Sequence, residues 1–287
     1  MLEKWPEADF WRTQGDTLIC ELCPHGCHIA VGQGGRCRVR QNINGRLCSV
    51  NFGQVSAIAL DPIEKKPFYR FKPGSRILSV GSWGCNLSCR FCQNWRISQE
   101  APPVKRYTPD ELVALSLDTV PKGNIGLAYT YSEPLVWYEF VHSCARLIKD
   151  AGLDNILITN GYINPRPLRE LSPLIAAANV DLKAFSPDFY KDICGGSLPP
   201  VLENIKLLAG QCHVEITALI VPDFNDGLSD MERLASWLTD VDPNIPLHIN
   251  RYFPNYQFSA PQTPKETLLE LKQVAERHLR YVYVGNV

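Results

Sequence analysis

The sequence GCNLSCRFCQN, residues 84–94, contains the pattern from which most of the architecture can be predicted. Its cysteines, Cys85, Cys89 and Cys92, have the spacing C-x3-C-x2-C, with an aromatic residue directly before the third. Thiolates are the usual protein ligands of iron–sulfur clusters, and a [4Fe–4S] cluster normally takes four of them. Three thiolates in so short a segment can hold three irons and leave the fourth open to a small molecule. A zinc knot fits less well, because structural zinc sites favour paired cysteines and close with four protein ligands.

The whole-chain composition is that of a globular protein of 287 residues, a length that suggests about two domains. Its 29 basic and 30 acidic residues nearly cancel, which is unlike the basic footprint of a nucleic-acid binder. No apolar run approaches the roughly 20 residues of a membrane span, and no secretory signal pattern begins the chain. Seven of the eleven cysteines fall into two groups, which indicates metal in a reducing compartment. We therefore predict a cytoplasmic protein with no nucleic-acid or membrane partner.

The second cysteine group lies in the N-terminal segment, where CELCPHGC at residues 20–27 is followed by another cysteine after a glycine-rich stretch. The candidate ligands are Cys20, Cys23, Cys27 and Cys37. Four thiolates serve both zinc and iron–sulfur clusters, so the residues leave open zinc, a second cluster, or free thiols. We expect residues 1–74 to form a small cysteine-rich domain. Within it, residues 45–50 and 55–60 are expected to pair as strands, and residues 61–70 to form a loop that either borders the site or is a solvated connector.

From residue 75 to 287, predicted strands and helices alternate. Strands are expected at residues 77–80, 125–128, 156–159, 180–184, 214–220 and 247–250. Capping boxes that begin with Thr108, Ser229 and Thr263 are expected to start three of the intervening helices. Such alternation predicts a parallel sheet of right-handed βαβ units, here a partial (β/α)6 TIM-like barrel with its site at the carboxyl ends of the strands.

Polar pairs two residues apart interrupt three of these apolar strands, so the two members of each pair face the same side of the sheet. The pairs are Asp181 and Lys183, Glu215 and Thr217, and His248 and Asn250. Any one pair is equally well explained as a structural ion pair or hydrogen bond. Several pairs at corresponding strand positions favour a polar lumen around a charged ligand.

Residues 84–94 resemble the signature of the radical S-adenosylmethionine (SAM) superfamily. The resemblance implies that the open iron chelates SAM and that one electron from the cluster cleaves SAM to a 5′-deoxyadenosyl radical. Together with Tyr131-Ser132-Glu133-Pro134, Thr159-Asn160-Gly161 and Asp181-Leu182-Lys183, they look like the successive motifs of the pyruvate formate-lyase activating enzyme group. That similarity implies a SAM site lined by Phe91, Asn94, Ser132, Glu133, Asn160, Asp181 and Lys183. This chain departs from the group's usual Gly-Gly-Glu-Pro, because Tyr131-Ser132 replaces the two glycines.

Nearly the whole chain also resembles the radical SAM enzyme of the AmmeMemoRadiSam system. The matching segments are residues 20–27, 61–67, 194–196 and 248–254. Members of that family often continue into a C-terminal zinc ribbon, so we expect this sequence to be either a short member or a shortened form.

Three further residues are candidates for catalysis or substrate contact. Cys194, followed by two glycines, would donate a hydrogen atom to a substrate radical or, as we prefer, simply fill space beside a turn. His248 and Arg251 are candidates for substrate contacts.

The predicted function is an activating-enzyme-like oxidoreductase that uses a [4Fe–4S] cluster, SAM, and a flavodoxin or ferredoxin reductant on an unidentified small-molecule or protein substrate. The alternatives are an activase that installs a glycyl radical on a partner enzyme, and a non-catalytic metal-binding or redox-sensing module.

Overall fold

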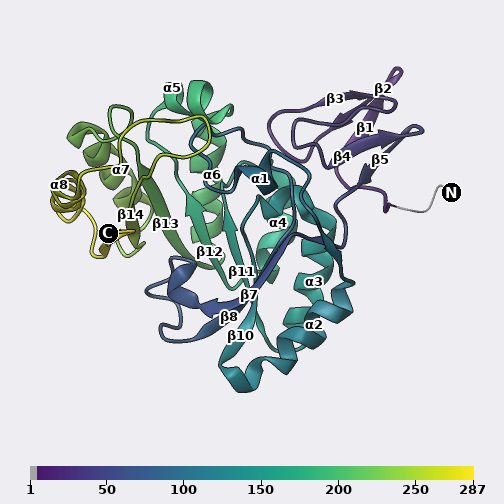
Figure 1. The fold of residues 1–287 in the computed structure, drawn as a ribbon, viewed down its shortest axis with the longest axis horizontal. Helices are drawn as coiled ribbons and strands as arrows, with labels where there is room; N and C mark the ends of the chain where they lie inside the picture. The colour runs from purple at the N-terminus through teal and green to yellow at the C-terminus, as the bar shows by residue number, and fades with distance from the viewer. Residues whose placement is uncertain (1–4) are drawn as a thin grey trace.

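The computed structural model describes residues 5–287, which form a small N-terminal lobe beside a larger α/β body (Figure 1). The body is built on one eight-stranded sheet in the order β15-β14-β13-β12-β11-β10-β8-β7. Every neighbouring pair in this sheet is parallel except β7 with β8. The strands are β7 Ala57–Pro62, β8 Arg76–Gly81, β10 Asn124–Tyr129, β11 Asp154–Thr159, β12 Ala177–Asp181, β13 His213–Ile220, β14 Leu247–Arg251 and β15 Val282–Gly285. Because β7 and β15 are its two edges, the sheet curves without closing.

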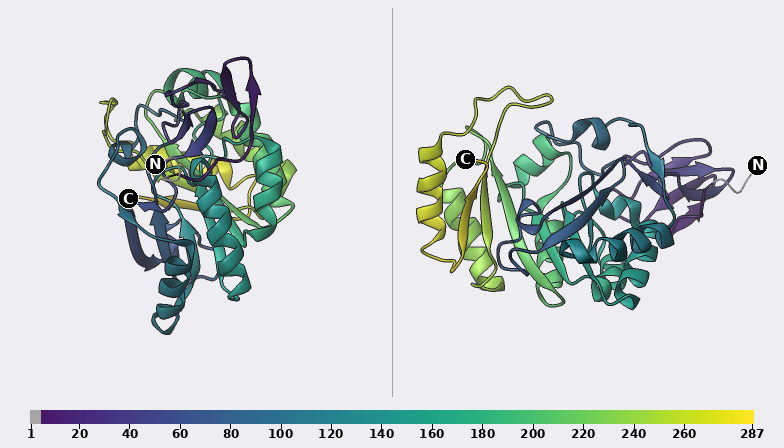
Figure 2. Two further views of the ribbon diagram at one scale, coloured as in Figure 1. Left: turned by 90° about the vertical axis from the view of Figure 1, so that its right-hand side faces the viewer. Right: turned by 60° about the horizontal axis from the view of Figure 1, so that its bottom comes forward.

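The helices follow the strands in alternation, and α2, α3, α7 and α8 cover the outer side of the sheet (Figures 1 and 2). The α-helices are α1 Trp95–Ser98, α2 Pro109–Asp118, α3 Tyr138–Asp150, α4 Pro165–Leu171, α5 Pro187–Phe189, α6 Leu198–Ala209, α7 Leu228–Val241 and α8 Lys265–Ala275. Short 3₁₀ turns lie at Ile63–Lys65, Val120–Lys122, Pro134–Trp137 and Ser172–Leu174, and a π turn at Tyr190–Cys194. The predicted partial barrel is thus confirmed.

The central strands are buried on both faces, which explains their almost continuous apolar sequence. In β11, for example, Asn155, Ile156 and Leu157 are all buried. The capping box at Thr108 is also confirmed, because its hydroxyl accepts the Glu111 N–H while the Glu111 carboxylate accepts the Thr108 N–H. None of the helices within residues 5–287 has both the length and the apolar character that a membrane crossing needs.

The N-terminal lobe consists of two small antiparallel units. The strands β1 Trp11–Gln14, β2 Thr17–Cys20 and β3 His28–Ala30 form one sheet, and β4 Arg40–Ile43 with β5 Arg46–Ser49 form a hairpin. Asn44 and Gly45, which join β4 to β5, have φ values of 53° and 81°. Two positive φ angles are what a two-residue type I′ turn requires, and Asn-Gly is its preferred sequence. A further short pair links β6 Gln54–Val55 to β9 Lys105–Arg106.

The structure corrects the predicted pairing of the strands near residues 45–60. β5 pairs with β4, whereas β7 pairs with β8 and belongs to the main sheet. The chain therefore enters the body near residue 57, ahead of the expected boundary at residue 74. Because β7 runs antiparallel to β8, the loop after it lies at the amino ends of the parallel strands, the end opposite to the predicted site.

Two of the three predicted helix starts are also corrected. No side chain caps the first turn of α7, whose N-cap is Gly227, so Ser229 lies inside the helix. The N-cap of α8 is Pro264, because the Thr263 hydroxyl is used elsewhere. It donates to the Ile220 carbonyl across 2.6 Å and accepts the Tyr252 N–H across 3.0 Å. The fourth barrel strand, expected at residues 180–184, lies three residues earlier, at Ala177–Asp181.

Candidate active site

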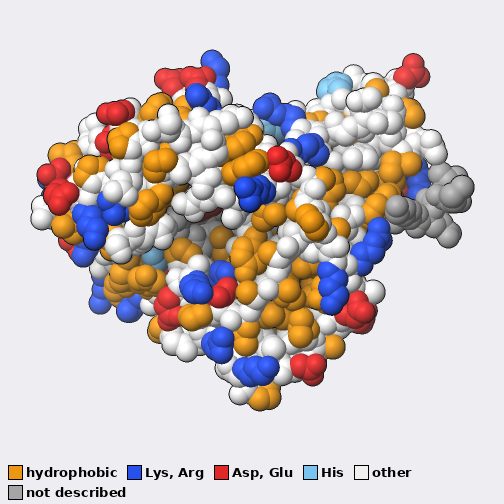
Figure 3. Space-filling model, in the orientation of Figure 1, with side chains coloured by type: hydrophobic (Ala, Val, Ile, Leu, Met, Phe, Trp, Pro, Cys, Tyr) orange, Lys and Arg blue, Asp and Glu red, His pale blue; other side chains and the backbone are white. Residues whose placement is uncertain are grey.

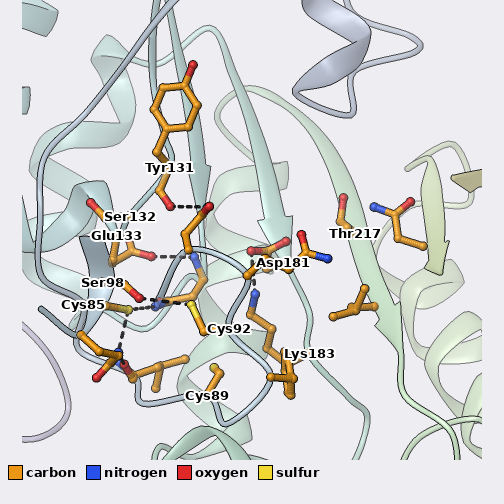
Figure 4. Close-up of a pocket in the computed structure, with 18 of the residues that line it drawn as sticks. Cys85, Cys89, Cys92, Ser98, Tyr131, Ser132, Glu133, Asp181, Lys183 and Thr217 are labelled. Atoms are coloured by element: carbon orange, nitrogen blue, oxygen red, sulfur yellow. Dashed lines mark hydrogen bonds and ion pairs between the residues drawn. The ribbon is translucent and has the colours of Figure 1, made fainter. Parts of the chain in front are cut away.

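A pocket lies at the carboxyl end of the parallel sheet (Figure 4). The loop at residues 84–94 forms one wall, and segments after β10, β11 and β12 together with side chains of β13 and β14 form the rest. Its lining includes all three cysteines of the loop and all seven residues predicted to bind SAM: Cys85, Cys89, Cys92, Phe91, Asn94, Ser132, Glu133, Asn160, Asp181 and Lys183. The fold therefore brings these ten residues from four separate segments to one place. Their individual roles stay predictions.

Hydrogen-bonding groups lie beside the thiols of Cys85 and Cys92. The Leu87 N–H points at Cys85 Sγ across 3.4 Å, and Asn160 Nδ2 approaches the same sulfur at 3.6 Å. Cys92 Sγ lies 3.1 Å from Ser98 Oγ, at the end of α1. Burial raises the pKa of Cys85 and Cys92, whereas hydrogen bonds donated to the sulfurs favour the thiolate, which is the form that binds iron. The arrangement fits the [4Fe–4S] cluster that the spacing predicts, with these three cysteines as its ligands.

Cys89 has a different partner, the fully buried Cys194. The hydrogen bond from the Cys194 thiol lowers the pKa of Cys89, although burial acts in the opposite direction. Cys194 ends the π turn after α5, and its carbonyl accepts the Ser88 N–H across 2.8 Å. Cys194 therefore lies behind the cysteine loop and, among the described residues, is not part of the pocket lining.

Glu133 is the buried carboxylate of the pocket. Its Oε1 accepts from the Thr159 hydroxyl at 2.6 Å and from the Leu135 N–H at 3.0 Å, while Oε2 accepts the Asn160 N–H at 2.8 Å. Burial raises the pKa of Glu133 to about 7, although these three donors favour the ionised form. Thr159 and Asn160 end β11, and Glu133 begins the 3₁₀ turn Pro134–Trp137, so the carboxylate joins two neighbouring strand ends.

Asp181 and Lys183 form an ion pair on the opposite wall, with Nζ 2.7 Å from Oδ2 (Figure 4). Burial disfavours the ammonium of Lys183, but Asp181 and the nearby Cys89 thiol outweigh this effect and raise its pKa. Glu133 on one side and this pair on the other give the pocket charges of both signs. SAM carries an ammonium, a sulfonium and a carboxylate, so these charges match its zwitterionic end.

The polar pair in β13 is divided between two environments. Thr217, near the strand's carboxyl end, lines the pocket together with Asn250 of β14. Glu215, two residues earlier, accepts hydrogen bonds from the amides of Tyr69 and Arg70 and from His248 Nε2 at 2.6 Å. His248 is therefore buried below the pocket and helps to anchor the loop between β7 and β8.

Arg251, the other predicted substrate contact, also lies apart from the pocket lining described above. Its Nε donates to the Thr263 carbonyl across 2.7 Å, and its guanidinium lies 5.2 Å from the centre of the Phe253 ring. Asn250 faces the lumen, so the next residue along an extended strand faces the other side.

Sequence reasoning missed several lining residues, namely Gln93, Ser98, Gln99, Tyr131, Leu219 and Asn286. Leu219 could have been predicted from the sequence, because it follows Thr217 by two residues and so lies on the same face of the strand. Tyr131 has φ of 69°, which is unusual for a bulky residue and gave no signal in the sequence. On the face shown in Figure 3 the molecule is hollowed near its centre, and basic and acidic side chains are interspersed around it.

The four N-terminal cysteines also lie near one another. Cys23 interacts electrostatically with the other three, and Cys20 interacts with Cys27 and Cys37. Within residues 5–287, no three Cys, His, Asp or Glu side chains are placed so that they could hold a single metal ion. That result applies equally to the cysteine loop of the pocket.

A model of the radical SAM superfamily matches residues 81–238. The chain belongs to the radical SAM superfamily. "Uncharacterized protein MJ0808" of Methanocaldococcus jannaschii is 41% identical over 98% of this chain and 85% of its own length. "Putative glycyl-radical enzyme activating enzyme MJ1632" of the same organism is 25% identical over 71% of this chain and 79% of its own length.

Two solved structures share the fold. A radical SAM methyltransferase from Sphaerobacter thermophilus superposes with a TM-score of 0.60 over 99% of this chain and 77% of the other, at 15% identity. Streptococcus suis SuiB bound to S-adenosylmethionine gives 0.56 over 73% of this chain and 51% of the other, at 12% identity. The chain is therefore an enzyme of the radical SAM class with activating-enzyme relatives, and this family implies a [4Fe–4S] cluster and SAM.

Proposed function

We propose that this radical SAM enzyme cleaves SAM in the pocket at the carboxyl end of the sheet and uses the product radical to remove a hydrogen atom from a substrate bound there. One observation carries the proposal: the three thiols of the cysteine loop and all seven predicted SAM-binding side chains line the same pocket. When bound, the cluster and SAM supply a 5′-deoxyadenosyl radical. The chain itself supplies ligands, charge and exclusion of water.

In this proposal Cys85, Cys89 and Cys92 hold the cluster, and the remaining lining residues orient SAM. Glu133 and Asp181 provide negative charge toward the ammonium and sulfonium. Lys183 provides positive charge toward the carboxylate. The buried setting strengthens these interactions, because charges attract more strongly where water is excluded.

The chain would need an electron from outside, and we expect a flavodoxin or ferredoxin to deliver it. For the thiols of the N-terminal lobe we also infer a bound metal. Zinc and a second iron–sulfur cluster are the two candidates that four cysteines allow.

The experiment is an anaerobic assay of the full chain. The protein is reconstituted with iron and sulfide, reduced, mixed with SAM, and assayed for 5′-deoxyadenosine. Wild type should form it, and Cys89→Ala should not. Cys144→Ala is a matched control, because Cys144 is a buried cysteine of α3 outside the pocket lining. A protein that carries its full cluster but neither binds nor cleaves SAM would overturn the proposal in favour of a metal-binding module.

A second candidate is an activase that installs a glycyl radical on a partner protein. Similarity to the second archaeal relative favours it, since that protein's name assigns it to this class. The two candidates differ in the fate of the radical. Incubation of the active enzyme with cell extract, followed by electron paramagnetic resonance (EPR) spectroscopy for a stable protein-borne glycyl radical, separates them.

A further inference from the structure

Burial raises the pKa of Cys20, Cys23 and Cys37 in the N-terminal lobe, and backbone amides beside these sulfurs act in the opposite direction. A backbone N–H is directed at each sulfur: Leu22 toward Cys20, His25 toward Cys23, Arg36 toward Cys27, and Val39 and Arg40 toward Cys37. In three cases the donor lies two residues after the cysteine. Amide donors of this kind stabilise anionic sulfur strongly. They stabilise a neutral thiol much less, because its sulfur accepts hydrogen bonds only weakly.

A buried cation adjoins these sulfurs. Arg40 is 1% exposed, its Nη1 lies 2.8 Å from Glu139 Oε1, and its guanidinium interacts with Cys20 and Cys37. Arg40 Nε and Glu139 Oε2 are both buried without a hydrogen-bond partner. A buried ion pair that leaves polar atoms without hydrogen-bond partners lowers the stability of the folded protein. Four thiolates and their metal carry net negative charge, and Arg40 would offset it.

Four cysteines are the ligand set of a structural zinc ion and of an iron–sulfur cluster alike. Zinc has no redox chemistry, whereas an iron–sulfur cluster takes up and releases single electrons. A position beside the cluster site of the pocket therefore favours the iron–sulfur cluster, because only that group could exchange an electron with it.

The lobe packs against the loop of the pocket on both sides of Cys85. Before Cys85, a Cβ placed on Gly84 would lie 2.7 Å from the Cys37 carbonyl oxygen and 2.6 Å from Val39 Cγ1. After Cys85, the Asn86 carbonyl lies 2.7 Å from Nε2 of His25. The N-terminal lobe therefore contacts the pocket loop on both sides of Cys85.

We propose that Cys20, Cys23, Cys27 and Cys37 ligate a second iron–sulfur cluster, through which an electron passes to the cluster site in the pocket. One electron enters from a low-potential carrier of the ferredoxin or flavodoxin class and leaves toward the pocket. The second cluster then returns to its oxidised state, and no proton moves and no bond is made or broken.

The test separates the two sites by mutation. Cys89→Ala/Cys92→Ala, purified and reconstituted without oxygen, should retain about four irons and four sulfides per chain and give an EPR signal on reduction. Cys20→Ser/Cys23→Ser should lose the EPR signal of the N-terminal cluster. It should keep the EPR signal of the pocket cluster, which SAM perturbs. Cys48→Ser is the matched control, because Cys48 is a buried cysteine of the same lobe, and its iron content should equal that of wild type. Circular dichroism shows whether each variant is folded.

Zinc alone, or no metal, in folded Cys89→Ala/Cys92→Ala would overturn the proposal of a second cluster.

The electron relay is tested by following the EPR signal of the pocket cluster. In Cys20→Ser/Cys23→Ser, reduction by dithionite should persist and reduction by flavodoxin should be lost. Equal reduction by flavodoxin in that variant and in wild type would overturn the relay. None of these readouts uses SAM cleavage, so they stand or fall separately from the proposed function.

Discussion

The carboxylate of Glu133 accepts the backbone N–H of Asn160 across 2.8 Å, and this bond joins the ends of two neighbouring barrel strands inside the pocket. The same carboxylate has its pKa raised to about 7 by burial. One group thus contributes to the geometry of the site and to its charge.

The raised pKa makes the stability of the metal-free protein depend on pH. Between about 4.5 and 7, folded Glu133 keeps a proton that the unfolded chain has released, so its contribution to stability falls as pH rises and is lost above 7. Glu133→Gln stays neutral throughout. The unfolding free energy of wild type relative to this variant should fall by on the order of 3 kcal/mol across that window. Urea titrations at several pH values measure it, and a flat difference would contradict the assignment.

The opposite dependence is expected for Glu215. Burial raises its pKa, but hydrogen bonds from His213, His248 and the amides of Tyr69 and Arg70 prevail and lower it to about 2. Its contribution is therefore present above about pH 4.5 and is lost as pH falls toward 2. Glu215→Gln should destabilise the protein at pH 7 by about 2–3 kcal/mol and show less further loss on acidification. Thermal unfolding followed by circular dichroism at pH 7, and then at steps from about pH 4 to about pH 2.5, measures both effects.

Gly84 tests the contact between lobe and loop. Its φ is +86° and a Cβ would meet Cys37 and Val39, so Gly84→Ala should separate the lobe from the cysteine loop. Gly74 has a similar φ of +82° but open space around it. Gly74→Ala therefore carries the same backbone strain without the clash. We expect Gly84→Ala to lower the melting temperature further and to lose iron from the pocket, as measured by calorimetry and iron analysis. Equal effects in the two variants would show that the contact is unimportant.

Cys194→Ala distinguishes two roles for that thiol. Buried against Cys89, it should act by hydrogen bonding to a cluster sulfur, and removing such a bond makes the cluster harder to reduce. The variant should keep its iron and still form 5′-deoxyadenosine with a strong reductant, while its midpoint potential, measured by EPR-monitored titration, becomes more negative. An unchanged midpoint potential, together with loss of the substrate-derived product alone, would instead favour hydrogen-atom donation to the substrate radical.

Much of the fold was predictable because the strands of a parallel sheet have a recognisable local sequence pattern. The central strands are buried on both faces, so residues such as 156–158 form an apolar run. The common location of the residues predicted to bind SAM followed from the resemblance together with the rule that parallel strand ends meet at one edge.

What escaped prediction depends on contacts between distant segments. The capping hydroxyl of Thr263 was assigned to α8, yet it bonds to Ile220, 43 residues away. His248 was placed among the substrate contacts, yet Glu215 holds it below the pocket. A polar side chain's final partner is set by tertiary packing, which neither a helix-capping pattern nor the alternation of strand faces contains.

The contact of the lobe with Gly84 and Asn86 also bears on how the protein is made. N-terminal segments leave the ribosome first, and domains generally fold as units in that order. The backbone of Cys37 and the ring of His25 are therefore synthesised before the loop that packs against them. The loop of the pocket therefore leaves the ribosome after the two N-terminal residues that it contacts and before the lining residues of β13 and β14, so the active site is completed only when most of the chain has been made.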